Sequence, residues 1–381
     1  MRESPDAVII GGGLIGMAIA WRASVHGLQV VVVDPHPGEG ASWAAAGMLA
    51  PVTEAHFGEE ALTRLNVAAA AAYPGFIAEL EAETDVACGY RRCGTLTVGF
   101  DADDMRVLDD FAALQRGLGL QLDRLSARAC RELEPMLSPA VSGGVHVPGD
   151  HQVDNRRLLH ALTVAVERRA TLRRQRVTEL LLAGDRVEGV ILDDGRPLPA
   201  PTVVLAAGCW SAGVAGIPRC ALPPVRPVKG QVLRLRVPLE PPLFAGTIRW
   251  LVQGSPGYLV PRADGEVVLG ATSEERGFDT EVTAGGVFQL LRDAYQVVPG
   301  ITEAVLTETR AGLRPGSPDN APLLGRTGVE GLLMATGHHR NGVLLTPITA
   351  EAIAALLTGG DVDPVAAPFT PHRFAAPAAA A

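Results

Sequence analysis

"DAVIIGGGLIGMAIAWRASVHGLQVVVVD", residues Asp6 to Asp34, is the stretch that decides the fold. Its apolar start, residues 7–10, is a continuous hydrophobic run typical of a parallel strand buried on both faces. Three glycines with GxGxxG spacing follow: Gly11, Gly13 and Gly16. The pattern predicts a strand, a tight glycine turn and a helix that ends at Gly27, followed by a second strand over residues 28–33.

The three glycines have separate physical roles in a dinucleotide-binding turn. The first allows the tight turn, the second lets the backbone approach a pyrophosphate, and the third lets the helix pack closely on the strand. Asp34 ends the second strand, where a carboxylate can accept hydrogen bonds from a ribose. Glycine-rich turns are common, but the strand, helix and acid around this one predict an adenine dinucleotide site. The motif alone is compatible with both NAD and FAD.

Composition narrows the class of protein. The chain has 381 residues, a length that is enough for two domains or one large one. Its residues are 47% hydrophobic and 20% charged, as in a soluble globular protein. Its net charge of −9 argues against a broad electrostatic grip on nucleic acid, and the basic segment over 167–176 is interpreted as a solvated helix face. The apolar run over 7–20 is interrupted by glycines and too short to span a bilayer, and no basic signal-peptide start precedes it. Five cysteines without a CxxC pair indicate a reducing compartment, so we expect a cytoplasmic protein without membrane contact.

A run of small side chains, "GASWAAAGMLAP" over Gly40–Pro51, directly follows the second strand. It is either a tightly packed helix start or a segment whose backbone amides approach a cofactor. Together with the glycine turn and Asp34, it resembles FAD-dependent amino-acid oxidases of the D-amino-acid oxidase superfamily and, within them, the glycine oxidases of thiamine biosynthesis. The resemblance covers nearly the whole chain, from Val8 to about Gly359, and it implies FAD as the cofactor.

The expected architecture is α/β, with a Rossmann-like FAD-binding domain of the GR2 type and an inserted antiparallel-sheet substrate domain. The buried strand in "TVVLAAGCWS", residues 202–211, predicts a return to the dinucleotide domain. Short alternating strands over 228–272, with a hairpin signal at Asp264-Gly265, predict the antiparallel sheet. We assign the FAD-binding domain to residues 1–85, 150–218 and 312–365, the substrate domain to 86–149 and 219–311, and a disordered tail to 366–381.

The resemblance also implies which residues contact the cofactor, with the adenine near Val177. Those predicted to lie along FAD are Gly11, Gly13, Leu14, Ile15, Gly16, Asp34, Pro35, Ala41, Ser42, Ala46, Gly47, Met48, Val177, Gly208, His338, His339, Arg340, Asn341, Gly342, Val343 and Leu344. Three residues depart from the family pattern. Asp34 stands where many relatives have glutamate, Trp43 is large enough to narrow the flavin edge, and His339 stands where relatives often have an aromatic residue.

Arg314 is the strongest candidate for substrate binding. It lies in "AGLRPGSPDNAPLLG", residues 311–325, among turn-forming residues, where an arginine is often only a surface charge or a structural ion pair. By the resemblance, "GLRPG" matches the segment whose arginine binds the substrate carboxylate, and a guanidinium fork suits that pairing. The strand alternation places Tyr258, Val260 and Arg262 on one face. Tyr258 is either a core aromatic or, by the resemblance, a second ligand of that carboxylate.

The stretch "GHHRNGVLL", Gly337 to Leu345, admits several interpretations: a metal site, a catalytic histidine pair, a nucleic-acid contact, or a loop that leads into a helix. No third ligand or orienting acid accompanies the histidines, so we expect no metal. A helix N-terminus here would stabilise negative charge on a reduced flavin. The resemblance implies that this loop wraps the flavin and that Arg340 lies near the substrate.

The resemblance implies oxidation of glycine, and of small amines such as sarcosine, to the imine. The products are glyoxylate, ammonia and hydrogen peroxide, and the imine also supplies the thiazole of thiamine. Glycine or a similar small amino acid and dioxygen are then the small-molecule partners, thiazole synthase is a candidate protein partner, and relatives suggest a homotetramer by analogy.

Three alternatives remain: a sarcosine or D-amino-acid oxidase, a quinone-linked amino-acid dehydrogenase, and, from a different class, a non-catalytic flavin-binding subunit. The presence of both Arg314 and Arg340 argues against a silent subunit. Monomeric sarcosine oxidases link flavin to a cysteine late in the chain, and this sequence has no cysteine after Cys220, so we expect the FAD to be non-covalent.

Overall fold

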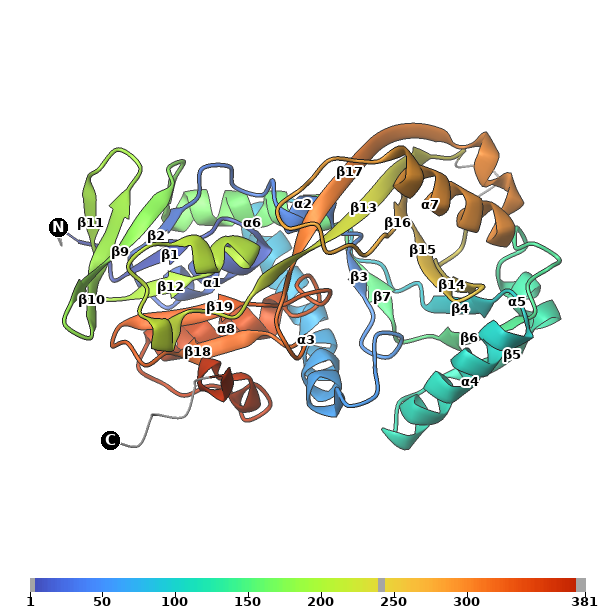
Figure 1. The fold of residues 1–381 in the computed structure, drawn as a ribbon, viewed down its shortest axis with the longest axis horizontal. Helices are drawn as coiled ribbons and strands as arrows, with labels where there is room; N and C mark the ends of the chain where they lie inside the picture. Colours follow the sequence, from blue (N-terminus) through green and yellow to red (C-terminus); the bar gives the residue numbers. More distant parts are fainter. Residues whose placement is uncertain (1–3, 239–243, 375–381) are drawn as a thin grey trace.

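Two large β-sheets with helices on their faces organise the chain (Figure 1). The computed structural model describes residues 4–238 and 244–374. A six-stranded sheet has the order β18-β19-β12-β1-β2-β8, and an eight-stranded sheet has the order β17-β13-β16-β15-β14-β4-β6-β5. Smaller sheets with the orders β11-β10-β9 and β3-β7 complete the described structure.

The six-stranded sheet is parallel except at one edge, where β18 runs antiparallel to β19. Its strands are β1 (Ala7–Ile10), β2 (Val30–Val33), β8 (Thr171–Arg173), β12 (Val203–Leu205), β18 (Leu323–Arg326) and β19 (Leu332–Thr336). Helices that pack on one another beside this sheet are α1 (Leu14–Val25), α3 (Glu60–Thr84), α6 (Asn155–Arg169) and α8 (Thr346–Leu357). Every residue of β1 and β2 is buried, as expected for strands covered on both faces.

The eight-stranded sheet is antiparallel apart from the pairing of β4 with β14, which is parallel. Its strands are β4 (Thr95–Gly99), β5 (Asp123–Ser126), β6 (Gly143–Val147), β13 (Arg226–Arg236), β14 (Thr247–Val252), β15 (Ser255–Pro261), β16 (Glu266–Gly270) and β17 (Val305–Gly316). The helices of this half are α4 (Ala102–Gly117), α5 (Ala127–Leu133) and α7 (Ala284–Val297). The predicted fold class, a Rossmann-like domain with an inserted sheet domain, is confirmed.

The remaining short elements lie in both halves of the structure. They are α2 (Ala41–Ala44), β3 (Met48–Leu49), β7 (His151–Gln152), β9 (Val177–Ala183), β10 (Arg186–Leu192), β11 (Pro197–Pro199), η1 (Gly208–Gly213), η2 (Arg219–Ala221) and η3 (Pro299–Glu303). The long strands β13 and β17 run from the eight-stranded sheet toward the six-stranded one (Figure 1). Because β17 continues to Gly316, the second sheet extends past the predicted domain boundary at residue 311. The domain division itself stays a prediction.

The predicted disordered tail over 366–381 is wrong for residues 366–374. These form η4 (Ala367–Phe369) and η5 (Pro371–Phe374), and Phe369 is buried in the core beside α8. Arg373 also donates to Asp319 Oδ2 at 2.8 Å, which ties the segment to the loop before β18. The alanine-rich composition of this segment gave no sign of the buried ring of Phe369 or of the ion pair between Arg373 and Asp319. Residues 375–381, the rest of the predicted tail, lie outside the described residues.

The glycine turn between β1 and α1 depends on a contact that no side chain could make. A Cβ atom on Gly16 would lie 1.9 Å from the carbonyl oxygen of Gly11, and one on Gly11 would lie 2.4 Å from that of Ala206. Gly11 also has a φ of +114°, a conformation that L side chains rarely adopt. The helix therefore packs against the strand at backbone distance, as the spacing predicts.

We expect Gly16→Ala to lower the free energy of unfolding by about 3 kcal/mol, because the added methyl must displace backbone atoms. Chemical denaturation followed by circular dichroism measures this loss. Gly117→Ala is the matched control, since a Cβ there meets nothing within 4 Å and its φ is not positive. Equal stability of the two variants would contradict the role assigned to Gly16.

Candidate functional site

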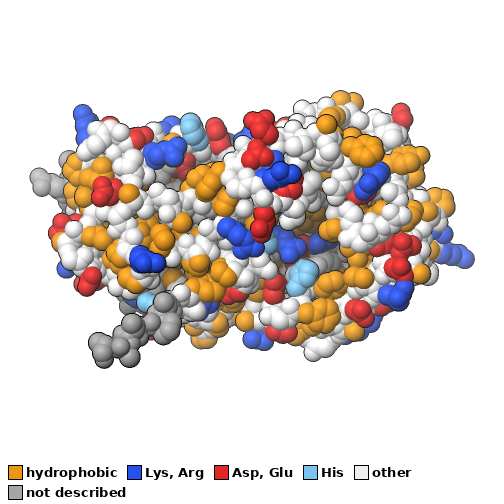
Figure 2. Space-filling model, viewed as in Figure 1, with side chains coloured by type: hydrophobic (Ala, Val, Ile, Leu, Met, Phe, Trp, Pro, Cys, Tyr) orange, Lys and Arg blue, Asp and Glu red, His pale blue; other side chains and the backbone are white. Residues whose placement is uncertain are grey.

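A cavity of about 1150 Å³ lies between the two large sheets. Figure 2 shows the molecule hollowed near its middle, where basic side chains and a histidine gather. The cavity is lined by the ends of β1, β2, β12 and β19 and by residues of β13, β15 and β17. Every predicted site residue lines it except Gly16, whose part is the helix packing described above.

The glycine turn between β1 and α1 forms one part of the cavity wall. Ser42 Oγ accepts the N–H of Leu14 at 3.0 Å, which links the run of small residues to the start of α1. Within residues 4–238 and 244–374, the N–H groups of Gly13 and Ile15 have no acceptor, and both residues line the cavity. Such unpaired amides at a helix N-terminus suit a phosphate group.

Asp34 faces the cavity, but its carboxylate also braces the turn. Its Oδ2 accepts the N–H of Gly12 at 2.7 Å, and its Oδ1 accepts the N–H of His36 at 2.8 Å. Two oxygens with about four lone pairs leave acceptor capacity for ribose hydroxyls. Its role toward a ribose stays a prediction.

The buried side chain of Arg262 supports the run of small residues through hydrogen bonds to backbone and side-chain oxygens. Arg262 donates to Ala46 O at 2.6 Å, to Val153 O at 3.1 Å and to Gln152 Oε1 at 2.7 Å. Gly47 has a φ of +75°, and a Cβ atom there would lie 2.0 Å from Val153 O. The backbone at Gly47 therefore packs directly against the backbone of Val153. The backbone over 46–48 is thereby presented to the cavity in one conformation.

Trp43 does not narrow the cavity, contrary to the sequence-based expectation. Its ring lies under the guanidinium of Arg156, 4.1 Å from the Cζ atom, and its carbonyl oxygen accepts from Asn155. Neighbouring small residues line the cavity, but Trp43 is not among its lining residues. A four-residue helix, α2, turns this one side chain away from its neighbours.

The loop that follows β19 crosses the cavity and then turns into α8. The helix itself begins at Thr346, after turns over residues 342–345. In the described chain, no acceptor pairs with the N–H groups of Gly342, Val343 and Leu344, which line the cavity. Tyr73 donates its hydroxyl to Val343 O at 3.0 Å and fixes this turn from α3. The loop thus presents three free donors to whatever the cavity holds.

Both histidines of this loop are neutral. Burial lowers the pKa of His338 to about 3, and its Nε2 lies 3.0 Å from Thr349 Oγ1 on α8. Burial, together with the cations Arg340 and Arg314, lowers the pKa of His339 to about 4. The described residues contain no group of three or more His, Cys, Asp or Glu side chains arranged to hold a metal ion. The histidines contribute packing and hydrogen bonding.

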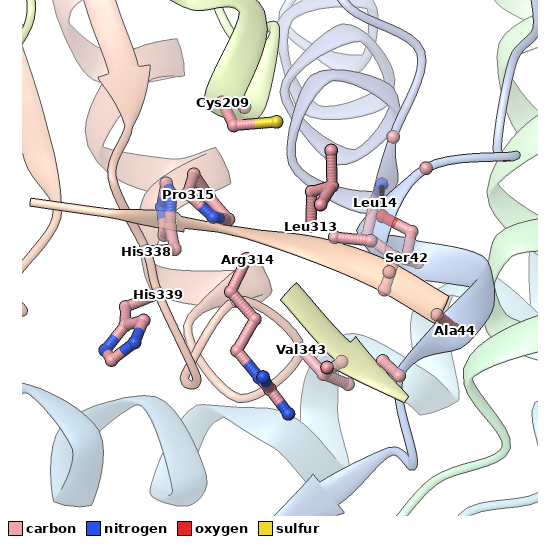
Figure 3. A pocket seen from close by; sticks show the side chains of 18 of the residues that line it. Leu14, Ser42, Ala44, Cys209, Leu313, Arg314, Pro315, His338, His339 and Val343 are labelled. Carbon is pink, nitrogen blue, oxygen red and sulfur yellow. Dashed lines mark hydrogen bonds between the residues drawn. The ribbon is translucent and has the colours of Figure 1, made fainter. Parts of the chain in front are cut away.

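Arg314 and Tyr258 meet at the other end of the cavity. Figure 3 shows Arg314 leaving the opposite side of β17 from its neighbour Leu313. The guanidinium donates to Thr272 O at 3.2 Å and interacts with the neighbouring Tyr258 hydroxyl, and burial lowers its pKa; an arginine side chain nevertheless stays protonated in a protein. No carboxylate of residues 4–238 or 244–374 lies within ion-pair distance of it. Burial likewise raises the pKa of Tyr258, so its hydroxyl keeps its proton.

Two cavity residues escaped the sequence analysis, Glu54 and Arg249. Their side chains form an ion pair, and Glu54 Oε2 also lies 3.9 Å from Arg340 Nη1. Burial alone would raise the pKa of Glu54, but Arg249 and Arg340 outweigh it and lower the pKa to about 2. A charged residue inside the otherwise apolar strand "TIRWLV" was the available signal for Arg249. Glu54 belongs to no motif.

The site fits an adenine dinucleotide with a flavin. Free amides stand at the glycine turn and in the loop before α8, which are two of the segments predicted to contact FAD. A Cβ atom on Gly11, Gly13 or Gly47 would lie within 3.1 Å of other protein atoms, so these glycines let the cavity wall pack at backbone distance. Among the described residues, none of the helices is both long enough and apolar enough to cross a membrane.

Comparison with known proteins matches this architecture. Residues 6–356 match the family model for FAD dependent oxidoreductases, DAO. The chain is 35% identical over 383 residues to the bifunctional protein ThiO/ThiG of Synechocystis sp., covering 98% of this chain and 55% of that protein. The chain thus spans about half the length of these bifunctional relatives.

Two solved structures are similar over nearly their full length. The glycine oxidase of Geobacillus kaustophilus superimposes with a TM-score of 0.88 at 32% identity, covering 96% of this chain and 98% of that one. The iminodiacetate oxidase of Chelativorans sp. superimposes with a TM-score of 0.84 at 30% identity, covering 96% and 98%.

We expect the buried, neutral His338 to make the fold acid-sensitive. Its folded pKa of about 3 lies below the value near 6.5 of an unfolded histidine, so the unfolded state binds the extra proton as pH falls. Stability is therefore fully present above pH 6.5, and its loss reaches about 1.4 kcal/mol per pH unit below that. His338→Gln flattens this slope in denaturation curves measured between pH 7 and 4. The exposed His26, changed to Gln, is the control, and an unchanged slope in His338→Gln would refute the assignment.

Proposed function

This chain belongs to the FAD-dependent oxidoreductase family, and from that premise we propose that it oxidises glycine, and small amines such as sarcosine, to the imine. Two electrons and two hydrogens pass from the amine to dioxygen, which becomes hydrogen peroxide. Water then converts the imine to glyoxylate and ammonia. The glycine oxidase of Geobacillus kaustophilus, 32% identical over 98% of this chain, supports this assignment.

The observation that carries the proposal is the guanidinium of Arg314. It is held inside the cavity by Tyr258 and backbone carbonyl groups, with no carboxylate partner among the described residues. A buried cation without a counter-ion is costly, and a substrate carboxylate relieves that cost through two parallel charge-assisted hydrogen bonds. The site therefore suits an amino acid.

The side chains of this site orient the substrate. Arg314 and Tyr258 would fix the carboxylate in the same cavity that residues 46–48 and 342–344 line. FAD held by these residues would supply an acceptor for the hydride and a route for its electrons to dioxygen. The unpaired amides of residues 342–344 stand ready to stabilise negative charge at that wall.

The acidic and histidine side chains beside Arg314 and Arg340 are not poised to take a proton near neutral pH. Glu54 has a pKa of about 2, while His338 and His339 are already neutral and buried. The amine therefore enters in its neutral form, and hydride transfer needs only orientation. The rate then depends on how well Arg314 holds the carboxylate.

The partners follow from the same proposal. Besides hydrolysis, the imine is handed to a thiazole synthase, and the relationship to bifunctional ThiO/ThiG proteins, of which this chain matches about half, supports that link. We also propose that the protein forms a homotetramer and lies in the cytoplasm. The oligomeric state can be tested on the purified protein, and the location on protein expressed in cells.

A peroxide assay tests the function directly. We expect purified yellow protein to release hydrogen peroxide on addition of glycine, with glyoxylate formed in equal amount. A panel of glycine, sarcosine and D-amino acids defines the substrate range. Reduction of an artificial dye without peroxide would instead identify a dehydrogenase, and no reaction with either acceptor would identify a non-catalytic flavin-binding subunit.

We expect Arg314→Met to lower kcat/KM for glycine roughly 10²-fold, because a lost charge-assisted pair is worth up to about 3 kcal/mol. Arg314→Lys keeps the charge but not the fork and should recover only part of the loss. Initial rates of peroxide release measure both. Arg326→Met on the exposed side of β18 is the control. Wild-type kcat/KM in Arg314→Met would sink the carboxylate assignment.

A further inference from the structure

Glu54 is ion-paired with two arginines, Arg249 closely and Arg340 only at the limit of ion-pair distance. Its carboxylate is paired with Arg249, while Arg340 Nη1 stands 3.9 Å away. Arg340 is 44% exposed, whereas the side chains of Glu54 and Arg249 are 11% and 17% exposed. The Glu54–Arg249 pair is thus nearly buried, whereas Arg340 is half-exposed and its guanidinium lies at the cavity without a hydrogen bond to Glu54.

We propose that Arg249 is a positioning residue: by holding the Glu54 carboxylate it prevents that carboxylate from capturing Arg340, whose guanidinium stays available to the substrate carboxylate. The inference rests on the proposed function for the identity of the substrate. The role of Arg249 itself follows from the geometry of the three side chains.

The strand register aims Arg249 at the cavity. Arg249 on β14 pairs with Tyr258 on β15, and residues directly opposite each other in an antiparallel pair place their side chains on the same face. Both side chains line the cavity. Arg249 Nη1 also donates to Thr53 Oγ1 at 3.3 Å, so the guanidinium contacts the side chain next to Glu54 as well as the Glu54 carboxylate.

The turn that carries Glu54 is anchored from the eight-stranded sheet side. The buried carboxylate of Asp150 accepts the N–H of Val52 at 3.1 Å and that of Thr53 at 2.8 Å. Gln115 Nε2 on α4 donates to Val52 O at 2.9 Å. With the backbone held from two elements, the Glu54 carboxylate can move only by side-chain rotation, which leaves Arg249 and Arg340 as its competing partners.

Loss of Arg249 would force that competition. Arg249 and Arg340 together offset the burial that raises the pKa of Glu54, and without Arg249 the nearly buried carboxylate would need closer contact with the remaining cation. His56 also faces Glu54, but burial and the nearby Arg340 lower its pKa and keep it neutral. Arg340, on a flexible and half-exposed side chain, is then the cation that moves into contact. The substrate loses a ligand as a result.

Four variants of the holoenzyme test the proposal: Arg249→Met, Arg249→Lys, Glu54→Gln and the double variant Arg249→Met with Glu54→Gln. We expect Arg249→Met to raise the KM for glycine at least tenfold with kcat within threefold of wild type. Adding Glu54→Gln removes the competing carboxylate, so the double variant should return to within threefold of the Glu54→Gln KM. Arg249→Lys keeps a cation beside Glu54 and should stay within threefold of wild type.

Acetate provides a readout without turnover, because it has the carboxylate but no amine to oxidise. Its Kd, from the change in flavin absorbance on titration, should rise at least tenfold in Arg249→Met and recover in the double variant. Arg124→Met, which breaks an arginine–aspartate pair far from the cavity, is the control. Flavin absorbance and far-ultraviolet circular dichroism confirm that each variant is folded and loaded.

The outcomes separate the inference from the proposed function. Unchanged KM and acetate Kd in Arg249→Met, or a double variant as weak as Arg249→Met, would overturn the positioning role. If wild-type protein releases no peroxide with glycine, the proposed function fails, and the acetate titration still decides the role of Arg249.

Discussion

The approach of α1 to β1 at backbone distance is the constraint on which the rest of the structure depends. With no side chain between Gly16 and the carbonyl oxygen of Gly11, the helix N-terminus comes directly over the strand ends. The amides of Gly13 and Ile15 then lie unpaired at the cavity, and the Ser42 hydroxyl can accept the N–H of Leu14. One close contact in the first domain thus shapes one wall of the cavity and seats the small-residue run beside it.

The second sheet supplies the charges that this wall lacks. Tyr258, Arg249 and Arg314 come from β15, β14 and β17, and Glu54 is held against them by the buried Asp150. Burial raises the pKa of Asp150 to about 6, despite the backbone N–H groups that stabilise its charged form. The cavity therefore joins a wall with unpaired backbone amides to an end lined by charged side chains, of which Arg249 and Arg314 come from the second sheet.

Much of this arrangement could be predicted from the chain. Residues 6–34 predict the first strand, turn and helix, because apolar periodicity and glycine spacing are local signals. Arg314 and Tyr258 were found by resemblance to a family, and both line the cavity. Glu54 and Arg249 were missed because neither has a local pattern, and their contact joins residues almost two hundred positions apart. Phe369 was missed because one aromatic in an alanine-rich tail carries no periodicity, although it is buried against the core.

A resemblance to a family indicated which residues would hold a flavin, whereas the residue pattern by itself determined the dinucleotide turn and the inserted sheet. Each of these follows from interactions within a few residues: backbone freedom at glycine, hydrophobic alternation, and amides left unpaired where a helix begins. Only the tertiary structure decided which cation pairs with Glu54, why Trp43 turns away and how Arg314 is left without a counter-ion. These outcomes depend on burial and on distances between strands far apart in the chain, because the strength of a charge pair is decided by the solvent and partners that folding leaves around it.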